Sequence, residues 1–365
     1  MIRLATVFSG IGAIEQAMFK MGLEHEIVFA CDTGERYIDT PVDEINAAIR
    51  NMNEEEKQLY IQNLYKKTGK KNFVKESYLA NYDLPADRWY DDIRFLNGVP
   101  FNGQVDLIVG GSPCQPFSAI GKRAGLEDAR GTLFYDYARL INEIQPKVFI
   151  FENVVGMLTH NKGKTYKAIK EVFESLNYNL YDTVLNSVDF DIPQDRKRLF
   201  VVGFRNDLVL NGEFTFPIGK KTNRKMFDFL ENGPVAARHY LGKKGFEFVT
   251  NPKYRNRARV NHEIIQTQKA NQQYNWNGDF VFEPLSNVEN NNEIMNRAYV
   301  GTWNEQQGVI RQLTYRECLR LMGFSDQFNI VVPNVPAYRQ AGNSIVVNVL
   351  QAILTQIMNV VDLNE

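Results

Sequence analysis

The sequence predicts an α/β fold in which helices cover both faces of a mainly parallel sheet. Short apolar runs rich in β-branched residues alternate with segments whose apolar residues recur at helical spacing. A glycine-rich turn follows the first of these runs, and a Gly-Gly-Ser-Pro turn follows a later one. Such alternation is typical of βαβ units, and sheets of this kind bind ligands at the carboxyl ends of their strands.

The composition narrows the class of protein. A chain of 365 residues can bury a substantial core and form more than one domain, and its 44% hydrophobic and 23% charged content is ordinary for a soluble protein. Three widely spaced cysteines (Cys31, Cys114 and Cys318) argue against a disulfide framework or a zinc cluster. Met1–Phe8 does not have the pattern of a signal peptide, and no apolar run approaches the length of a membrane span. We therefore expect a cytoplasmic protein with no bound metal and no membrane partner.

Two turns near the start of the chain have features of a ligand site. The predicted strand Leu4–Phe8 is followed by Ser9-Gly10-Ile11-Gly12 and then by apolar residues at helical spacing. A strand, a glycine-rich turn and a helix open a nucleotide-type βαβ unit, whose turn lets the backbone approach a ligand. A second predicted strand, Ile27–Ala30, leads to Asp32, where such folds hold a pair of ribose hydroxyls. A helix cap is an equally good interpretation of Asp32.

A cysteine stands at the end of a later strand. Cys114 follows the predicted buried strand Val105–Val109 across the Gly-Gly-Ser-Pro turn. Most free cysteines are small buried hydrophobes, but a tight turn at the ligand edge of a sheet is a poor support for a core side chain. We therefore expect Cys114 to be a nucleophile. The polar, glycine-containing stretch 119–130 has the composition of a loop that closes over a substrate.

Later strand ends add a carboxyl group and two arginines. A helix is predicted from Gly131 to Pro146, and strands are predicted at 148–151, 180–185 and 199–204. Glu152 follows the first of these strands, and Arg196 and Arg198 precede the last. A thiol can add to an electron-poor ring, a carboxyl can protonate a ring nitrogen, and a guanidinium can hold a carbonyl oxygen.

This set of groups would make carbon 5 of a cytosine nucleophilic toward the methyl group of a sulfonium donor, although the spacing alone does not identify the base. Rival interpretations are an ion pair between Glu152 and Arg196 and simple core filling by Cys114.

Two further segments stand apart from the βα alternation. Residues 39–88 combine helical spacing with many charges, which indicates a helical insertion at the periphery with a solvated face. Between Gly219 and Val260, eleven Lys and Arg residues face three Asp and Glu residues and are interleaved with six aromatic residues. A charge run is more often a solvated loop, but this mixture suits phosphate contacts beside bases, and we favour nucleic-acid binding.

Six motifs resemble, in order and spacing, those of the DNA cytosine-5 methyltransferases. They are Phe8-Ser9-Gly10-Ile11-Gly12, Gly111-Ser112-Pro113-Cys114-Gln115-Pro116-Phe117-Ser118, Glu152-Asn153-Val154, Gln194-Asp195-Arg196-Lys197-Arg198, Arg311 to Cys318, and Gln340-Ala341-Gly342-Asn343-Ser344. The match covers nearly the whole chain outside the insertion and the basic segment. It implies a Rossmann-like fold of S-adenosylmethionine-dependent methyltransferases with a smaller target-recognition domain, in an enzyme of the bacterial modification type.

The resemblance also implies roles for individual residues. Cys114 is similar to the nucleophile that attacks carbon 6 of cytosine, Glu152 to the carboxyl that engages ring nitrogen 3 and the exocyclic amine, and Arg198 to the arginine that holds the carbonyl oxygen. Arg196 resembles its neighbour in the pocket. The positions that match the surroundings of S-adenosylmethionine are Phe8, Gly10, Gly12, Asp32, Thr33, Asp92, Ile93, Pro113, Leu133, Asn343 and Ser344. Thr33 departs from the family, which often has Trp there.

By the same resemblance, residues 1–216 form the catalytic and cofactor-binding domain, 217–311 the target-recognition domain, and 312–365 a return segment that completes the first. The implied reaction transfers a methyl group from S-adenosylmethionine, with S-adenosylhomocysteine as product, to a cytosine flipped out of double-stranded DNA. We expect a monomer, and the resemblance allows for a cognate restriction endonuclease that acts on the same site without direct contact. A tRNA cytosine-5 methyltransferase and a non-catalytic DNA-binding homologue are the alternatives.

Overall fold

A computed structural model describes residues 1–112, 133–271 and 276–363 of the chain, which separates into two compact units. Unit 1 comprises Met1–Leu185, Lys197–Ile218 and Leu350–Glu365, and unit 2 comprises Asn186–Arg196 and Gly219–Val349. These boundaries mark the parts of the chain that pack compactly together. The functional division at residues 216 and 311 stays a prediction.

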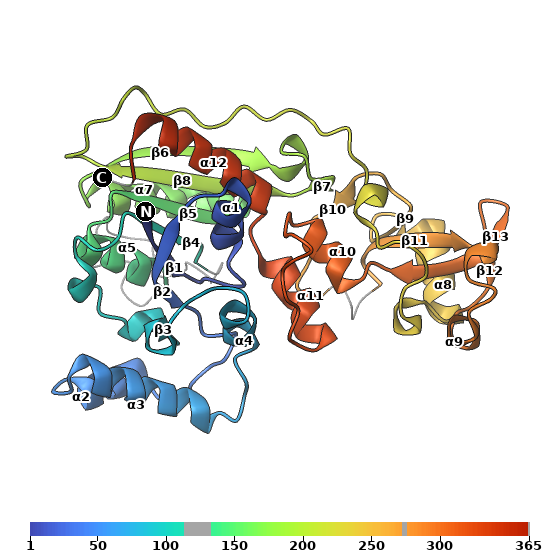
Figure 1. Ribbon diagram of the computed structural model, residues 1–365, viewed down its shortest axis with the longest axis horizontal. Helices are drawn as coiled ribbons and strands as arrows, with labels where there is room; N and C mark the ends of the chain where they lie inside the picture. The colour runs from blue at the N-terminus through green and yellow to red at the C-terminus, as the bar shows by residue number, and fades with distance from the viewer. Residues whose placement is uncertain (113–132, 272–275, 364–365) are drawn as a thin grey trace. The chain divides into compact units, whose positions relative to one another are not determined.

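Unit 1 is built on a seven-stranded sheet with the order β3-β2-β1-β4-β5-β8-β6 (Figure 1). The strands are β1 Ile2–Val7, β2 His25–Cys31, β3 Trp89–Tyr90, β4 Leu107–Gly110, β5 Val148–Val154, β6 Tyr178–Asn186 and β8 Lys197–Arg205. β1 pairs in parallel with β2 and β4, β2 with β3, and β4 with β5, whereas β8 runs antiparallel to β5. The predicted α/β fold with a mostly parallel sheet is confirmed. In the sheet, β2 lies on one side of β1 and β4 lies on the other side, so the strand order reverses between β1 and β4. The ends of β1 and β4 therefore flank the point where doubly wound sheets bind ligands.

Helices pack on both faces of this sheet. They are α1 Ala13–Met21, α5 Leu133–Ile144, α6 Gly156–Thr159, α7 Lys164–Glu174 and the C-terminal part of α12 Val347–Val360. α5 and α7 share one apolar core with the side chains of alternate strand residues, among them Phe149 and Phe151. α1 packs on the other face, because Thr6 of β1 donates a hydrogen bond of 3.2 Å to Glu15.

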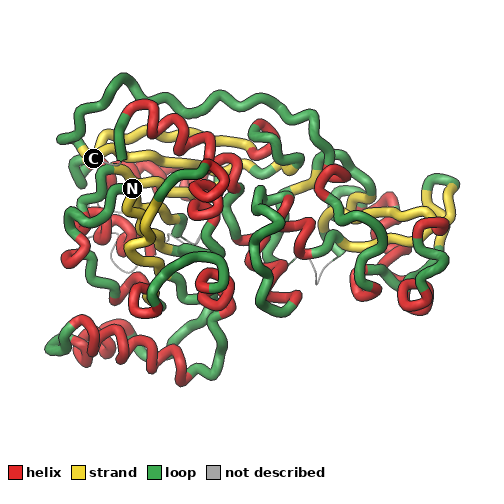
Figure 2. Tube along the Cα trace, viewed as in Figure 1, coloured by secondary structure: helices red, strands yellow, loops and turns green. Residues whose placement is uncertain are grey.

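The predicted insertion lies beside β3, and Figure 2 shows its first two helices set apart from the sheet. It contains α2 Val42–Ile49, α3 Glu54–Lys67 and α4 Phe73–Leu79. A capping box between Asn53 and Glu56 starts α3. Ile45, Ile49, Ile61 and Tyr65 form a small core of their own. The insertion therefore has an apolar core beneath its exposed charged residues, as its combination of helical spacing and many charges predicts.

Unit 2 contains a four-stranded sheet with the order β12-β13-β11-β9 and a two-stranded sheet of β10 and β7. Its strands are β7 Gln194–Asp195, β9 Ala258–Val260, β10 Ile265–Gln266, β11 Gly278–Pro284, β12 Gly301–Trp303 and β13 Gln306–Gln312, and its helices are α8 Lys243–Thr250, α9 Asn292–Arg297, α10 Tyr315–Arg320 and α11 Asn334–Asn343. Phe246 of α8 packs with Phe280, Phe282 and Ile310 of the larger sheet.

The motif from Arg311 to Cys318 has a structural role in unit 2. Arg311 is buried and its Nη1 lies 2.8 Å from Oε2 of Glu317, which also accepts the N–H of Thr314. Thr314 and Glu317 form the capping box of α10. The motif therefore fixes the passage from β13 into this helix.

One stretch of the described residues, Asn334–Val360, is long and apolar enough to cross a membrane by length and composition alone. However, 56% of its apolar window is buried within the protein. Leu350, Ile353 and Leu354 are among its fully buried residues. A stretch with this much burial packs in the protein core. The sequence does not single the stretch out, because polar residues interrupt it.

Candidate active site

The turn after β1 has the backbone shape that its glycines predict. Gly10 and Gly12 have φ angles of 53° and 77°, and Phe8 also has a positive φ of 51°. This region is sterically costly for a residue with a side chain, and such residues gather at functional sites. Phe8 is half-buried and packs against the core cluster that α5 also joins. Leu133, the first residue of α5, packs against the same cluster.

Asp32 ties the turns after β1 and β2 together. Its carboxylate accepts the N–H of Gly10 at 2.9 Å and the N–H of Gly34 at 2.7 Å. Burial raises the pKa of Asp32, and the two N–H donors oppose that shift. The helix-cap interpretation is wrong, because the next helix, α2, has Pro41 at its N-cap. Asp32 instead keeps acceptor capacity at the ligand edge of the sheet, since a carboxylate offers about four lone pairs.

The segments after β2 and β3 are joined by one buried ion pair, and a second ion pair lies within the segment after β3. Arg36 pairs with Asp91, and its Nε donates to the carbonyl oxygen of Thr33 at 2.8 Å. Asp92 is buried and pairs with Arg94, whose Nη2 lies 2.6 Å from Oδ2. Thr33 therefore contributes a backbone contact to this network. Ile93 is buried beside Asp92.

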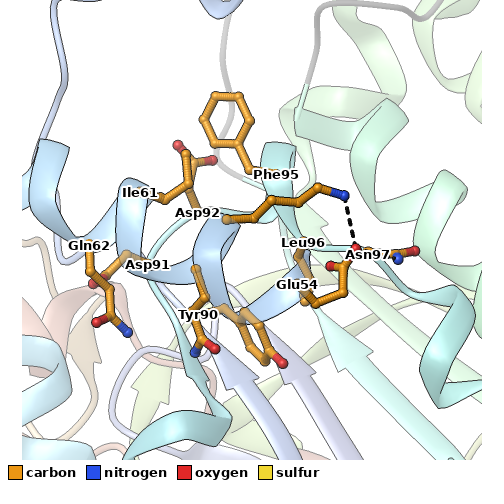
Figure 3. A pocket seen from close by; sticks show the side chains of 11 residues that line it. Glu54, Ile61, Gln62, Tyr90, Asp91, Asp92, Phe95, Leu96 and Asn97 are labelled. Carbon is orange, nitrogen blue, oxygen red and sulfur yellow. Dashed lines mark hydrogen bonds and ion pairs between the residues drawn. The ribbon is translucent and has the colours of Figure 1, made fainter. Parts of the chain in front are cut away.

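Sequence reasoning missed Arg36, Tyr65 and Arg94 as parts of this site. The hydroxyl of Tyr65 donates to Asp92 at 2.7 Å across 27 positions of sequence, a contact that no local pattern reveals. α3 and the segment after β3 also enclose a hollow (Figure 3), whose lining is Glu54, Lys57, Gln58, Ile61, Gln62, Tyr90, Asp91, Asp92, Phe95, Leu96 and Asn97. Both acids after β3 thus face the insertion.

The end of β4 lies directly against the end of β5. A Cβ atom on Gly111 would come within 2.9 Å of Oε2 of Glu152 and 2.8 Å of its backbone oxygen, so only glycine fits here. Nδ2 of Asn153 donates to the carbonyl oxygen of Ser112 at 2.9 Å, and both residues are buried. The chain segment that leads to Cys114 is therefore fixed beside Glu152. Cys114 itself, Pro113 and the loop 119–130 lie outside the described residues.

Glu152 and Arg198 form an ion pair at this edge. Nε of Arg198 lies 3.0 Å from Oε1 of Glu152, and 17% and 14% of the two side chains are exposed. β5 and β8 bring them together, because Arg198 is registered with Val154 and residues two apart on a strand share a face. The pair therefore reaches solvent, where a substrate could contact it.

Arg196 has a different environment within unit 2. Its guanidinium is buried and donates to three backbone carbonyls, those of Gln268 at 3.1 Å, Gly342 at 3.1 Å and Ser344 at 2.8 Å. These bonds hold the end of α11, where Asn343 is exposed and Ser344 is buried. Arg196 thus positions the segment that carries both candidate cofactor residues of unit 2.

The basic segment of unit 2 is partly core. Three of its six aromatic residues, Phe229, Tyr240 and Phe246, are buried. Phe248 and Tyr254 stack with ring centroids 4.3 Å apart. The exposed cations near that stack on α8 and the following turn are Lys243, Lys244, Lys253, Arg255 and Arg257.

The sequence also has five amide side chains close together (Gln266, Gln268, Asn271, Gln272 and Gln273), whose composition suits base contacts but is equally typical of exposed loops. Gln268 is buried, and its Nε2 donates to the carbonyl oxygen of Cys318, so it is a structural residue. Asn271 is exposed, and Gln272 and Gln273 lie outside the described residues. Cys31 and Cys318 are buried thiols, as small core side chains are. Within the described ranges, no group of three or more His, Cys, Asp or Glu side chains is arranged to hold a metal ion.

Comparison with known proteins identifies the family. The profile of the family described as C-5 cytosine-specific DNA methylase matches residues 41–359. Type II methyltransferase M.SsoII of Shigella sonnei is 36% identical over 296 residues, which cover 80% of this chain and 72% of that protein. Type II methyltransferase M.HpaII of Haemophilus parainfluenzae is 34% identical over 306 residues, covering 79% of this chain and 82% of that protein.

The fold has solved counterparts. The crystal structure of the S. pombe Dnmt2 methyltransferase matches 98% of this chain and 98% of its own, with a TM-score of 0.66 and 19% sequence identity. A likeness at this identity shows the fold, so the expected Rossmann-like methyltransferase fold is confirmed. With the family profile spanning most of its length and relatives above 30% identity, the chain belongs to the C-5 cytosine-specific DNA methylase family and is a DNA (cytosine-5-)-methyltransferase.

Proposed function

We propose that this enzyme methylates carbon 5 of a flipped-out cytosine in a specific duplex sequence through a covalent adduct with Cys114, using S-adenosylmethionine. The close contact of Gly111 with Glu152 carries the proposal, because it puts the segment leading to the thiol beside a carboxyl group. The Glu152–Arg198 ion pair supports it, since a carboxyl and a guanidinium are the groups that a cytosine's ring nitrogen and carbonyl oxygen require.

The residues of unit 1 fit the cofactor. A Cβ on Gly10 would meet nothing closer than a backbone oxygen at 4.0 Å, so the turn leaves room for a ligand against its backbone. Phe8 and Leu133 offer half-buried apolar surface, and Asp32 offers acceptor capacity for ribose hydroxyls. Ile93 and the backbone of Thr33 complete the adenosine end, and Pro113, Asn343 and Ser344 are assigned to the cofactor by the resemblance alone.

The chain's own groups account for the chemistry around the base. Bound S-adenosylmethionine supplies an electrophilic methyl group. The Cys114 sulfur adds to carbon 6 while Glu152 gives a proton to ring nitrogen 3, so that the ring's electron pair becomes available at carbon 5. Arg198 holds the carbonyl oxygen where negative charge develops. After methylation, water takes the proton from carbon 5, the carbon–sulfur bond breaks to release the Cys114 sulfur as a thiolate, and ring nitrogen 3 returns its proton to Glu152, which restores the aromatic ring. Arg196 keeps the end of α11 in place.

Unit 2 contributes the duplex contacts in this proposal. The exposed cations around the Phe248–Tyr254 stack are suited to phosphate oxygens, which supply most of the affinity for DNA. We infer a monomer that acts in the cytoplasm, in a restriction-modification setting in which an endonuclease of the same specificity needs no contact with this chain.

Bisulfite sequencing of plasmid DNA from cells that express the protein tests the reaction, because it reports the methylated base and its sequence context. Cys114→Ala tests the adduct. We expect this variant to bind DNA and S-adenosylhomocysteine with unchanged affinity and to transfer no methyl group. Cys318→Ala, which alters a buried cysteine of unit 2, is the matched control and should keep activity. Methylation by Cys114→Ala at the wild-type rate would refute the adduct.

A further inference from the structure

Three side chains of the helical insertion reach the turns that follow β1, β2 and β3. They are Tyr82, Asn72 and Tyr65, and each makes a hydrogen bond to one of these turns. All candidate cofactor residues of unit 1 except Pro113 and Leu133 lie in these turns. The insertion is therefore bonded to this edge of the sheet at three separate places.

Tyr82 holds the glycine-rich turn after β1. Its hydroxyl donates to the carbonyl oxygens of Ile11 at 3.0 Å and Gly12 at 2.7 Å. A Cβ atom on Gly12 would lie 2.2 Å from the Tyr82 ring, so the glycine is needed for the ring to pack there as well as for its positive φ. The shape of this turn and the position of Tyr82 depend on each other.

Asn72, the N-cap residue of α4, bridges the turns after β2 and β3. Its Nδ2 lies 3.1 Å from the carbonyl oxygen of Asp32 and 3.3 Å from Oδ1 of Asp91. A Cβ atom on Gly34 would lie 2.1 Å from Oδ1 of Asn72. As at Gly12, a glycine with positive φ lets an insertion side chain come up against the backbone.

Tyr65, near the end of α3, holds Asp92. Its hydroxyl donates to Oδ2, and the guanidinium of Arg36 lies 4.6 Å from the centre of its ring. Burial and the Asp92 charge raise the pKa of Tyr65, so the hydroxyl keeps its proton and remains a donor. Arg94 also donates to Asp92, from its backbone N–H to Oδ1 and from its guanidinium to Oδ2, so the carboxylate is fixed in one orientation.

We propose that the insertion is a scaffold for the cofactor site, in which Tyr65, Asn72 and Tyr82 are positioning residues that fix the turns receiving the adenosine end of S-adenosylmethionine. This rests on the proposed function. Residues held in place before the ligand arrives lower the ordering cost of binding, so the insertion acts on cofactor affinity. The competing role, a DNA contact, is disfavoured by charge, because nine acidic and eight basic residues lie between Asp39 and Arg88.

Tyr65→Phe and Tyr82→Phe test the scaffold, because each removes one hydroxyl and keeps the ring. We expect the Kd for S-adenosylhomocysteine, measured by calorimetry without DNA, to rise roughly 5- to 30-fold in each, as for the loss of one buried hydrogen bond. The KM for S-adenosylmethionine should rise in parallel, while kcat at saturation and the KM for DNA stay within about twofold, as expected when an interaction shared by ground state and transition state is removed. Tyr60→Phe, on α3 at the edge of the same apolar cluster, is the matched control and should change neither constant.

Hydrogen exchange of the wild-type protein gives a second readout that needs no variant. Amides of α3 and α4 should exchange more slowly when S-adenosylhomocysteine is bound, because opening of these helices would release the turns that hold the ligand, and bound ligand therefore makes such opening rarer. Unchanged affinity in both Phe variants, unchanged exchange in these helices, or a change confined to the KM for DNA would each overturn the scaffold. Failure of the proposed function looks different, since the wild-type protein would then bind no S-adenosylhomocysteine or methylate no DNA.

Discussion

Nε of Arg198 lies 3.0 Å from Oε1 of Glu152, on neighbouring antiparallel strands of unit 1. A substitution that keeps the shape of Glu152 but removes its acidic group distinguishes a catalytic role of the carboxyl from a structural role of the ion pair. We expect Glu152→Gln to lower kcat roughly 10²- to 10⁴-fold, the range for loss of one acid–base group. Binding of DNA and S-adenosylhomocysteine should persist, because the amide keeps the shape and still accepts from Arg198. Single-turnover transfer of a labelled methyl group measures the loss.

The control for this variant is Glu171→Gln on α7, whose carboxylate faces Lys167 in an exposed pair. It should keep full activity, since exposed ion pairs contribute little. A rate for Glu152→Gln within twofold of wild type would show that Glu152 does not act on the base.

Arg196 and Arg198 are two positions apart, but replacing each of them should have a different effect on stability and activity. Arg196→Met leaves the buried carbonyls of Gln268, Gly342 and Ser344 without their donor, which should cost about 2–5 kcal/mol of unfolding free energy. Arg198→Met removes a partly exposed pair and should cost ~1 kcal/mol while abolishing most of the activity. Urea unfolding and methyl transfer measured on both variants check this. Equal losses of stability would contradict the assignment of Arg196 to the end of α11.

This difference could not be predicted from the Gln-x-Arg-x-Arg spacing. A continuous strand would place both arginines on one face. In the structure, Gln194–Asp195 pairs with β10 in unit 2, and β8 begins only at Lys197 in unit 1. Arg196 lies between the two strands, and a local sequence pattern does not reveal where the chain changes from one pairing strand to another.

The strands themselves were predictable because their cores are apolar and continuous. β1, β2, β4, β5, β6 and β8 lie within a few residues of the predicted runs. The antiparallel direction of β8 was not predicted, although a signal exists. Only residues 187–196 separate β6 from β8, and parallel neighbours need a crossover of a dozen or more residues. Contacts such as Tyr82 with Gly12 join positions 70 apart, which a single sequence does not reveal.

Gly12→Ala and Gly22→Ala separate backbone strain from crowding at the cofactor turn. Both glycines have positive φ, but a Cβ on Gly22 would meet open space, whereas one on Gly12 would strike Tyr82. Gly22→Ala should therefore cost only about 1–2 kcal/mol for the left-handed backbone and leave cofactor affinity unchanged. Gly12→Ala should cost more and weaken S-adenosylhomocysteine binding at least tenfold. Calorimetry and thermal unfolding of the two variants give both quantities, and equal behaviour would show that Tyr82 moves away freely.

The exposed cations of unit 2 should control DNA affinity through salt. Replacing Lys253, Arg255 and Arg257 with Gln should raise the KM for DNA and flatten the dependence of log affinity on log salt, by about 0.9 for each phosphate that the protein no longer neutralises. The same replacement of Lys66, Lys67 and Lys70 in the insertion is a control of equal charge and should leave the slope unchanged. If only the second triple variant flattens the slope, the duplex lies against the insertion.

Glu15 should make stability depend on pH. Burial raises its pKa to about 7, against hydrogen bonds from Tyr78 and Thr6 that favour the charged form. In the unfolded chain the carboxyl titrates near 4.5. Between these values only the unfolded state loses the proton, so the unfolding free energy should fall as pH rises, by up to about 1.4 kcal/mol per unit, and level off above pH 7.

Glu15→Gln removes this titration while keeping a similar shape and a side-chain oxygen for Tyr78. Urea unfolding at pH 5 and pH 7.5 should show a decline in the wild-type protein that exceeds the decline in the variant by roughly 2–3 kcal/mol, the scale of such a pKa shift. The variant should therefore be the more stable protein at pH 7.5. Glu24→Gln, just after α1, is the control because it should follow the wild-type profile. Parallel profiles for wild type and Glu15→Gln would mean that the buried carboxyl keeps the same pKa in the folded and unfolded states.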